Sequence, residues 1–276
     1  MTYTGITSDV VKVRGHNDDE VEAYMARPQG EGPFPGVVVI HHAPGWDEWT
    51  MEVAWKLAHR GYAVISPHLY GRHGTDPDEA PIRARSRGGM RDDQVMGDVD
   101  GSAKYLRGRP FSNGKIGIIG FCSGGRQTFL AACTVPGIDA AIDCWGGGVI
   151  VDDPSKLTDA QPVAPITFAE NLNCPLLGLF GNEDTSPTPD EVNRTEEELK
   201  RLNKTYEFYR YEGAGHAFFS TDRYRYRPEQ AVDAWKRITS FYDRYLKPSG
   251  GGGTPPKFIG ASPLVSLSGN VPLRAS

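Results

Sequence analysis

KIGIIGFCSGG, residues 115–125, is the stretch that decides the fold of this chain. Its first six residues form a short apolar run, rich in β-branched side chains, of the kind found in a parallel sheet covered on both faces. Residues 126–134 follow the glycines, are rich in Ala, Leu and Phe, and are typical of a helix. We therefore expect the chain to reverse direction at Cys122, between a buried strand and a helix packed against it.

Small residues surround this reversal. Gly120 and Gly124 lie two residues to either side of Cys122, where the backbone of such a turn is strained and its neighbours approach closely. The pattern is that of a nucleophile elbow with cysteine in the place usually taken by serine. A helix N-terminus at this point favours the thiolate, the reactive form. The other interpretation is a structural glycine turn that carries a buried, inert cysteine.

Length and charge limit the class of protein. A chain of 276 residues can bury one large core, and its net charge of -5 argues against nucleic acid or an anionic membrane as the main partner. A small-molecule substrate fits better. The N-terminus lacks a basic segment followed by an apolar one, and no apolar run reaches the length of a membrane span, which predicts a cytoplasmic protein. Three further cysteines, without a CxxC pair, are expected to be small buried side chains: Cys133, Cys144 and Cys174.

Strand and helix patterns alternate along the chain. Strands are predicted at 8–14, 21–27, 36–42, 62–67, 115–120, 140–144, 176–180 and 206–211, and helices at 47–59, 92–107, 126–134, 190–203 and 228–246. The first two strands should form an antiparallel edge. The order predicts an α/β fold of the α/β-hydrolase plan, with a mostly parallel eight-stranded sheet flanked by helices and the nucleophile after the fifth strand.

Composition divides the chain into a domain, residues 1–247, and a tail, residues 248–276. The tail is rich in Gly and Pro and contains four consecutive glycines at 250–253, which are typical of a flexible linker. Because a tail that is ordered must lie against a surface, we expect it to dock on its own subunit or on a second copy in a homodimer.

A thiol nucleophile in acyl transfer needs a base and a carboxylate that orients the base. In the α/β-hydrolase plan these follow the nucleophile in the order acid, then base. Asp184, just past the strand at 176–180, is the predicted acid, with Glu183 as the alternative. His216, in a glycine-flanked loop after the last strand, is the predicted base. The sequence therefore predicts a catalytic triad of Cys122, Asp184 and His216.

Two backbone N–H groups should form an oxyanion hole. We expect them to belong to Ser123, directly after the nucleophile, and to Ala43, in the loop beyond the third strand. The same loop is expected to bring His42 to the thiol or the substrate. The pair His41 and His42 has no third ligand at zinc-like spacing, so a metal site is not predicted.

Four segments of the sequence resemble the dienelactone hydrolase family, also called carboxymethylenebutenolidases. They are PHLY at 67–70, FSNGK at 111–115, GFCSGG at 120–125 and GAGHAF at 213–218, and the resemblance spans roughly residues 36 to 246. The cysteine elbow is the most specific of these segments, because most relatives in the wider fold carry serine there. The resemblance implies hydrolysis of a lactone or activated ester through an acyl-cysteine, without a cofactor.

The resemblance is incomplete at the substrate pocket. Where the family has a glutamate that helps to activate the thiol, this sequence has His42, and where it has an arginine four residues after the catalytic histidine, this sequence has Ser220. A different pocket is therefore expected. Four arginines lie near the position of the family's other substrate-binding arginine: Arg83, Arg85, Arg87 and Arg91. The aromatic residues expected to line an apolar pocket are Trp46, Tyr70, Trp145 and Phe218.

These observations favour a cysteine hydrolase in which His216 deprotonates Cys122, the thiolate attacks an ester or lactone carbonyl, and water activated by His216 releases the acid. One alternative keeps the triad but changes the reaction to that of a thioesterase or a C–C bond hydrolase. Another is a non-catalytic protein of the same fold that binds a small ligand. A nucleotide site is excluded, because the glycine turn has no P-loop lysine and does not match GxGxxG.

Overall fold

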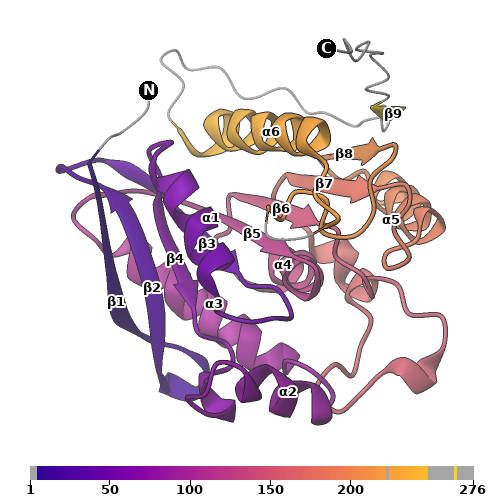
Figure 1. Ribbon diagram of the computed structural model, residues 1–276, viewed down its shortest axis with the longest axis horizontal. Helices are drawn as coiled ribbons and strands as arrows, with labels where there is room; N and C mark the ends of the chain where they lie inside the picture. The colour runs from indigo at the N-terminus through magenta and orange to yellow at the C-terminus, as the bar shows by residue number, and fades with distance from the viewer. Residues whose placement is uncertain (1–4, 222–223, 248–263, 266–276) are drawn as a thin grey trace, which may run out of the picture.

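A twisted, mostly parallel sheet runs through the molecule, with helices on both of its faces (Figure 1). The computed structural model describes residues 5–221, 224–247 and 264–265. Within these residues the strand order is β1-β2-β4-β3-β5-β6-β7-β8-β9. β1 pairs antiparallel with β2, and β2 with β4, whereas the later pairs are parallel. The predicted α/β-hydrolase fold, with its antiparallel leading edge, is confirmed.

The strands lie close to their predicted positions. Their bounds are β1 Ile6–Arg14, β2 Glu20–Pro28, β3 Phe34–Ile40, β4 Ala63–Pro67, β5 Ser112–Phe121, β6 Ala140–Cys144, β7 Leu176–Gly181, β8 Tyr206–Tyr211 and β9 Leu264–Val265. Strand β9 is additional to the eight predicted strands and pairs with β8 of the same chain. The rest of the tail, on which the predicted docking to a second copy depends, lies outside the described residues.

The helices form two layers. Their bounds are α1 Glu48–Ala58, α2 Glu79–Ser86, α3 Asp92–Arg107, α4 Ser123–Thr134, α5 Pro189–Arg201 and α6 Pro228–Leu246. Buried side chains of α1 and α6 pack on one face of the sheet, and those of α3, α4 and α5 pack on the other (Figure 1). Alternation along β3 serves both layers, because Val37 and Val39 face α1 while Val38 and Ile40 face the opposite core.

Helix α2 is absent from the sequence prediction. Most of its residues are polar, and its buried side is short, formed by Ala80, Pro81 and Ala84. The helical periodicity of apolar residues is therefore too weak to predict this helix. The helix carries Arg83 and Arg85, which the sequence places in an irregular basic segment. Among the described helices, none has the length and apolarity needed to span a membrane.

Close packing at the turn between β5 and α4 explains its two glycines. A Cβ at Gly120 would lie 2.0 Å from the carbonyl oxygen of Gly124, and a Cβ at Gly124 would lie 2.3 Å from that of Ile40. Both obstacles are backbone atoms, which cannot move aside as a flexible side chain can. The glycines therefore let α4 approach β3 and β5 closely enough to hold Cys122 at the carboxyl edge of the sheet.

We expect Gly124→Ala to lower the free energy of unfolding by about 3 kcal/mol, because the added methyl group overlaps the backbone of β3. Chemical denaturation followed by circular dichroism measures this loss. Gly71→Ala is the matched control, since a Cβ there would meet its nearest neighbour at 3.6 Å, an ordinary contact. Equal stability of the two variants would contradict the close approach of α4 to β3.

Candidate active site

Cys122 occupies a strained turn at the start of α4. Its backbone angles are φ 57° and ψ -120°, a region that residues other than glycine rarely adopt. The turn is fixed from both sides, because the N–H of Cys122 donates to the Cys144 carbonyl at 3.0 Å and the N–H of Gly125 donates to the Cys122 carbonyl at 2.9 Å. This geometry is that of the predicted elbow, with the thiol placed at the helix N-terminus.

Polar neighbours stabilise the thiolate form of Cys122. Burial opposes ionisation, but hydrogen bonds from His216 and from the backbone N–H groups of Ser123 and Ala43 outweigh it and lower the pKa of the thiol. The two N–H groups predicted to form an oxyanion hole therefore converge on the sulfur. An oxygen that becomes negatively charged beside this sulfur would find two donors already in place.

His216 links the thiol to a buried carboxylate. Its Nδ1–H donates to Oδ2 of Asp184 at 2.9 Å, and the imidazole also hydrogen-bonds Cys122. Burial disfavours the imidazolium, but the hydrogen bonds to Asp184 and Cys122 raise the pKa of His216 to about 9. Because the pKa of Cys122 is lowered and that of His216 is raised, the pair favours thiolate and imidazolium together.

The structure distinguishes between the two candidate acids. Asp184 follows β7, its side chain is only 1% exposed, and its second oxygen accepts the N–H of Ser186 at 2.9 Å. Glu183 is exposed to solvent. The carboxylate that contacts the predicted base is therefore that of Asp184, in the arrangement expected from the sequence.

Tyr70 and Arg85 hold the loop that supplies one of the N–H donors. The hydroxyl of Tyr70 donates to the Ala43 carbonyl at 3.0 Å, and Nη1 of Arg85 lies 3.4 Å from the same oxygen. Burial raises the pKa of Tyr70 to about 12, which keeps this hydroxyl a donor. The sequence marks Tyr70 only as an expected pocket residue, because its partner is 27 positions away.

A second pair of a histidine and an aspartate borders the thiol. Nε2–H of His42 donates to Oδ2 of Asp47 at 2.6 Å, and the ring packs against Trp49 with centroids 4.9 Å apart. Asp47 is also the N-cap of α1 and accepts the N–H of Thr50 at 3.0 Å. Although burial opposes its ionisation, these hydrogen bonds lower the pKa of Asp47 to about 2. The sequence prediction did not include this role of Asp47; its position before the helix is typical of a cap, but the contact with His42 is tertiary.

The thiol opens into a cavity of about 200 Å³. Its described lining residues are His42, Pro44, Cys122, Trp145, His216, Ala217, Ser220, Tyr224 and Arg225. Trp145 lies on the wall, with its ring centroid 6.3 Å from that of His216. The volume suits a small acyl group rather than a large one.

Four residues predicted to bind substrate lie elsewhere, and one of them is Arg85, which contacts the Ala43 carbonyl. Phe218 is fully buried behind Trp145, with ring centroids 5.2 Å apart, so it supports the wall without forming it. Trp46 turns away and stacks on His68 at 4.8 Å, while its N–H donates to the Ser66 carbonyl at 3.0 Å. Arg83 pairs with Glu79 on the outer side of α2. These corrections remove the four side chains from the described cavity wall.

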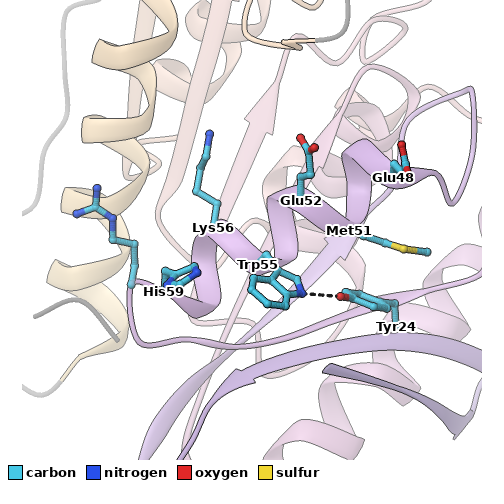
Figure 2. A pocket seen from close by; sticks show the side chains of 8 residues that line it. Tyr24, Glu48, Met51, Glu52, Trp55, Lys56 and His59 are labelled. Atoms are coloured by element: carbon cyan, nitrogen blue, oxygen red, sulfur yellow. Dashed lines mark hydrogen bonds between the residues drawn. The ribbon is translucent and has the colours of Figure 1, made fainter. Parts of the chain in front are cut away.

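A larger hollow, of about 760 Å³, lies on the outer surface of α1 (Figure 2). Its lining residues include Tyr24 and Trp55, and the Trp55 N–H donates to the Tyr24 hydroxyl at 2.7 Å. None of its described lining residues belongs to the cavity at Cys122. The candidate active site is therefore the smaller cavity, where the reactive side chains meet.

Comparison with known proteins agrees with this arrangement. The family model described as "Dienelactone hydrolase family" matches residues 21–246. A "Putative carboxymethylenebutenolidase" from Methylorubrum extorquens is 34% identical over 245 residues, which cover 87% of this chain and 82% of that protein. One with the same name from Escherichia coli K12 is 34% identical over 231 residues, covering 82% and 83%.

Among solved structures, that of a "Putative Dienelactone Hydrolase" from Klebsiella pneumoniae superposes with a TM-score of 0.79 at 32% sequence identity. The match covers 88% of this chain and 100% of the other. The family model extends over most of the domain, from β2 to the end of α6, and includes the elbow and the loops that carry Asp184 and His216. This chain belongs to the dienelactone hydrolase family.

Proposed function

We propose that this protein is a cysteine hydrolase that cleaves a lactone or an activated ester of a small acid through an acyl-cysteine intermediate. The observation that carries the proposal is the environment of Cys122, where one imidazole and two backbone N–H groups converge on a sulfur in a strained turn. Membership of the dienelactone hydrolase family supports hydrolysis of an ester or lactone bond.

Acylation begins from the thiolate and imidazolium pair. The Cys122 sulfur attacks the substrate carbonyl carbon, and the carbonyl oxygen takes the negative charge while accepting hydrogen bonds from the N–H groups of Ser123 and Ala43. His216 gives its proton to the leaving oxygen as the C–O bond breaks. Asp184 keeps the imidazole oriented and stabilises its positive charge.

Deacylation uses the imidazole that acylation left neutral. His216 accepts a proton from water as the water oxygen attacks the thioester carbonyl, and the same two N–H groups stabilise the second oxyanion. The C–S bond then breaks, the acid leaves, and Cys122 and His216 return as thiolate and imidazolium. Water, substrate and side chains of this chain supply every proton and electron pair in the two steps.

A substrate panel tests the reaction class. It contains p-nitrophenyl acetate, a dienelactone, a neutral lactone, an acyl thioester and a diketone with a cleavable C–C bond. We expect kcat/KM for the best ester or lactone to exceed that for the thioester and the diketone by at least about tenfold, because the two N–H groups and His216 match attack on an oxygen ester. A preference for the thioester or the diketone would overturn the proposal.

Alkylation by iodoacetamide near neutral pH separates an enzyme from a binding protein. Only the thiolate reacts, and burial raises the pKa of both Cys133 and Cys174 to about 12 and holds that of Cys144 well above its usual value. We expect Cys122 to be alkylated at least about tenfold faster than the other three, as measured by peptide mass spectrometry. Equally slow labelling of all four, together with no turnover of the panel, would favour a ligand-binding protein.

A further inference from the structure

The wall of the catalytic cavity is mostly uncharged. Beside the reactive pair and His42, its buried part is formed by Trp145 and Ser220, each only 1% exposed. The charged side chain among the remaining described lining residues is Arg225, which is exposed and donates through Nε to the Tyr224 hydroxyl at 3.0 Å. Apart from the reactive pair and His42, the interior of the cavity therefore offers uncharged groups, and the guanidinium of Arg225 lies at the surface.

Two of those neutral groups are hydrogen-bond donors without a partner. In residues 5–221 and 224–247, neither the Ser220 hydroxyl nor the indole N–H of Trp145 makes a hydrogen bond, although both polar atoms are buried. An unpaired buried donor costs free energy, and an acceptor that reaches it recovers that free energy. A bound acyl group with an oxygen of its own would supply that acceptor.

Ser220 is fixed relative to the reacting groups. Its N–H donates to the Ala217 carbonyl at 3.1 Å, which closes a turn directly after His216. Ala217 has a φ of 60°, so this turn is a specific backbone conformation. Trp145 follows β6 and also adopts a positive φ, of 44°. Ser220 and Trp145 therefore both lie in turns with a specific backbone conformation, next to the thiol.

Charge disfavours an acyl group with a carboxylate. Such a group would lie beside the Cys122 thiolate, whose charge the His216 imidazolium already balances, and near two further carboxylates, that of Asp184 behind His216 and that of Asp47 behind His42. Like charges at short range raise the free energy of binding, most of all where water is excluded. The guanidinium of Arg225 is exposed and partly screened by solvent, so it compensates weakly.

We propose that the preferred substrate, on the proposed ester or lactone chemistry, carries a small uncharged acyl group with an ether, hydroxyl or keto oxygen near its carbonyl. That oxygen accepts hydrogen bonds from Ser220 and Trp145. The substrate class is therefore esters or lactones of small neutral oxy-acids, and Ser220 determines specificity within it.

Matched p-nitrophenyl esters test this inference with the full chain. The methoxyacetate and the butyrate have acyl chains of equal length and differ by one oxygen in place of a methylene. We expect Ser220→Ala to lower the ratio of kcat/KM for methoxyacetate to that for butyrate by about fivefold, the value of one neutral hydrogen bond. Comparing this ratio between wild type and variant cancels the different intrinsic reactivity of the two esters.

Ser102→Ala is the matched control, because the Ser102 hydroxyl is also buried and unpaired but lies in α3, outside the described cavity wall. We expect it to leave the ratio unchanged. A second comparison needs no variant, so it tests the inference even if Ser220→Ala does not fold. For the wild-type enzyme, methoxyacetone should inhibit about fivefold more strongly than 2-pentanone. For wild type, the monosuccinate ester should also be a poorer substrate than the butyrate.

The inference is overturned if Ser220→Ala leaves the ester ratio unchanged, if the two ketones inhibit equally, or if the monosuccinate is the best ester. Each of these results can occur while Cys122→Ala abolishes turnover, in which case only the specificity inference fails. Persistent turnover in Cys122→Ala would instead show that the proposed function itself is wrong.

Discussion

Cys122→Ala should lower kcat for ester hydrolysis by at least about 10⁴-fold, because it removes the atom that forms the covalent bond in both steps of the proposed reaction. The residual rate would come from the two backbone N–H donors and from His216 acting on water. Steady-state hydrolysis of the preferred panel ester measures the loss, and an unchanged melting temperature would show that the fold is intact.

Cys133→Ala is the matched control for this variant. Cys133 lies on the same helix, α4, but it is buried and its thiol has a raised pKa, so its removal should leave kcat within about twofold of the wild-type value. Equal, weak turnover by wild type and Cys122→Ala would mean that Cys122 is not the nucleophile.

Asp184→Asn should lower kcat by about 10³-fold or more while the fold is retained. The amide has nearly the shape of the carboxylate, but it no longer stabilises a positive imidazole and can hold the ring in the wrong tautomer. Hydrolysis of the same ester measures the loss. Glu183→Gln is the matched control, because it makes the same change from carboxylate to amide at an exposed neighbouring residue that does not contact His216.

The pH profile of kcat/KM gives a second measurement on the same variant. In wild type, activity should fall at low pH as the Cys122 thiolate is protonated and at high pH as His216, with a pKa of about 9, loses its proton. Burial lowers the pKa of His216 and the hydrogen bond to Asp184 raises it, so removing the carboxylate should move the alkaline limb to lower pH. An unmoved alkaline limb would contradict the role of Asp184.

Periodicity and sequence order predicted most of the fold. The predicted bounds of α3 and α6 and those of β6 and β8 agree with the structure to the residue, because apolar faces and a proline at the start of α6 mark them. Helix α2 was missed since its buried stripe is short and its other positions are polar. The extra strand β9 follows a glycine-rich stretch of sequence. Its pairing with β8 is a tertiary contact, which the neighbouring sequence does not predict.

Part of the candidate site could likewise be predicted from the sequence and part could not. The proximity of Cys122, Asp184 and His216 could be predicted because the fold brings together residues that follow β5, β7 and β8 in a fixed order along the chain. Contacts such as that of Tyr70 with the Ala43 carbonyl depend on tertiary packing, so they could not be predicted from the sequence. The positions of Trp46 and Phe218 were wrong for a related reason, since an aromatic residue near a site in sequence can face either the cavity or the core.

Trapping the acyl-enzyme tests the central claim most directly. The full chain is mixed with an excess of p-nitrophenyl acetate, quenched in acid within the first turnover, and analysed by intact-mass and peptide mass spectrometry. We predict one added acetyl group, located on Cys122 and absent from Cys122→Ala. Rapid hydrolysis without any such adduct under these conditions, or an adduct on another residue that turns over at the rate of catalysis, would contradict the account.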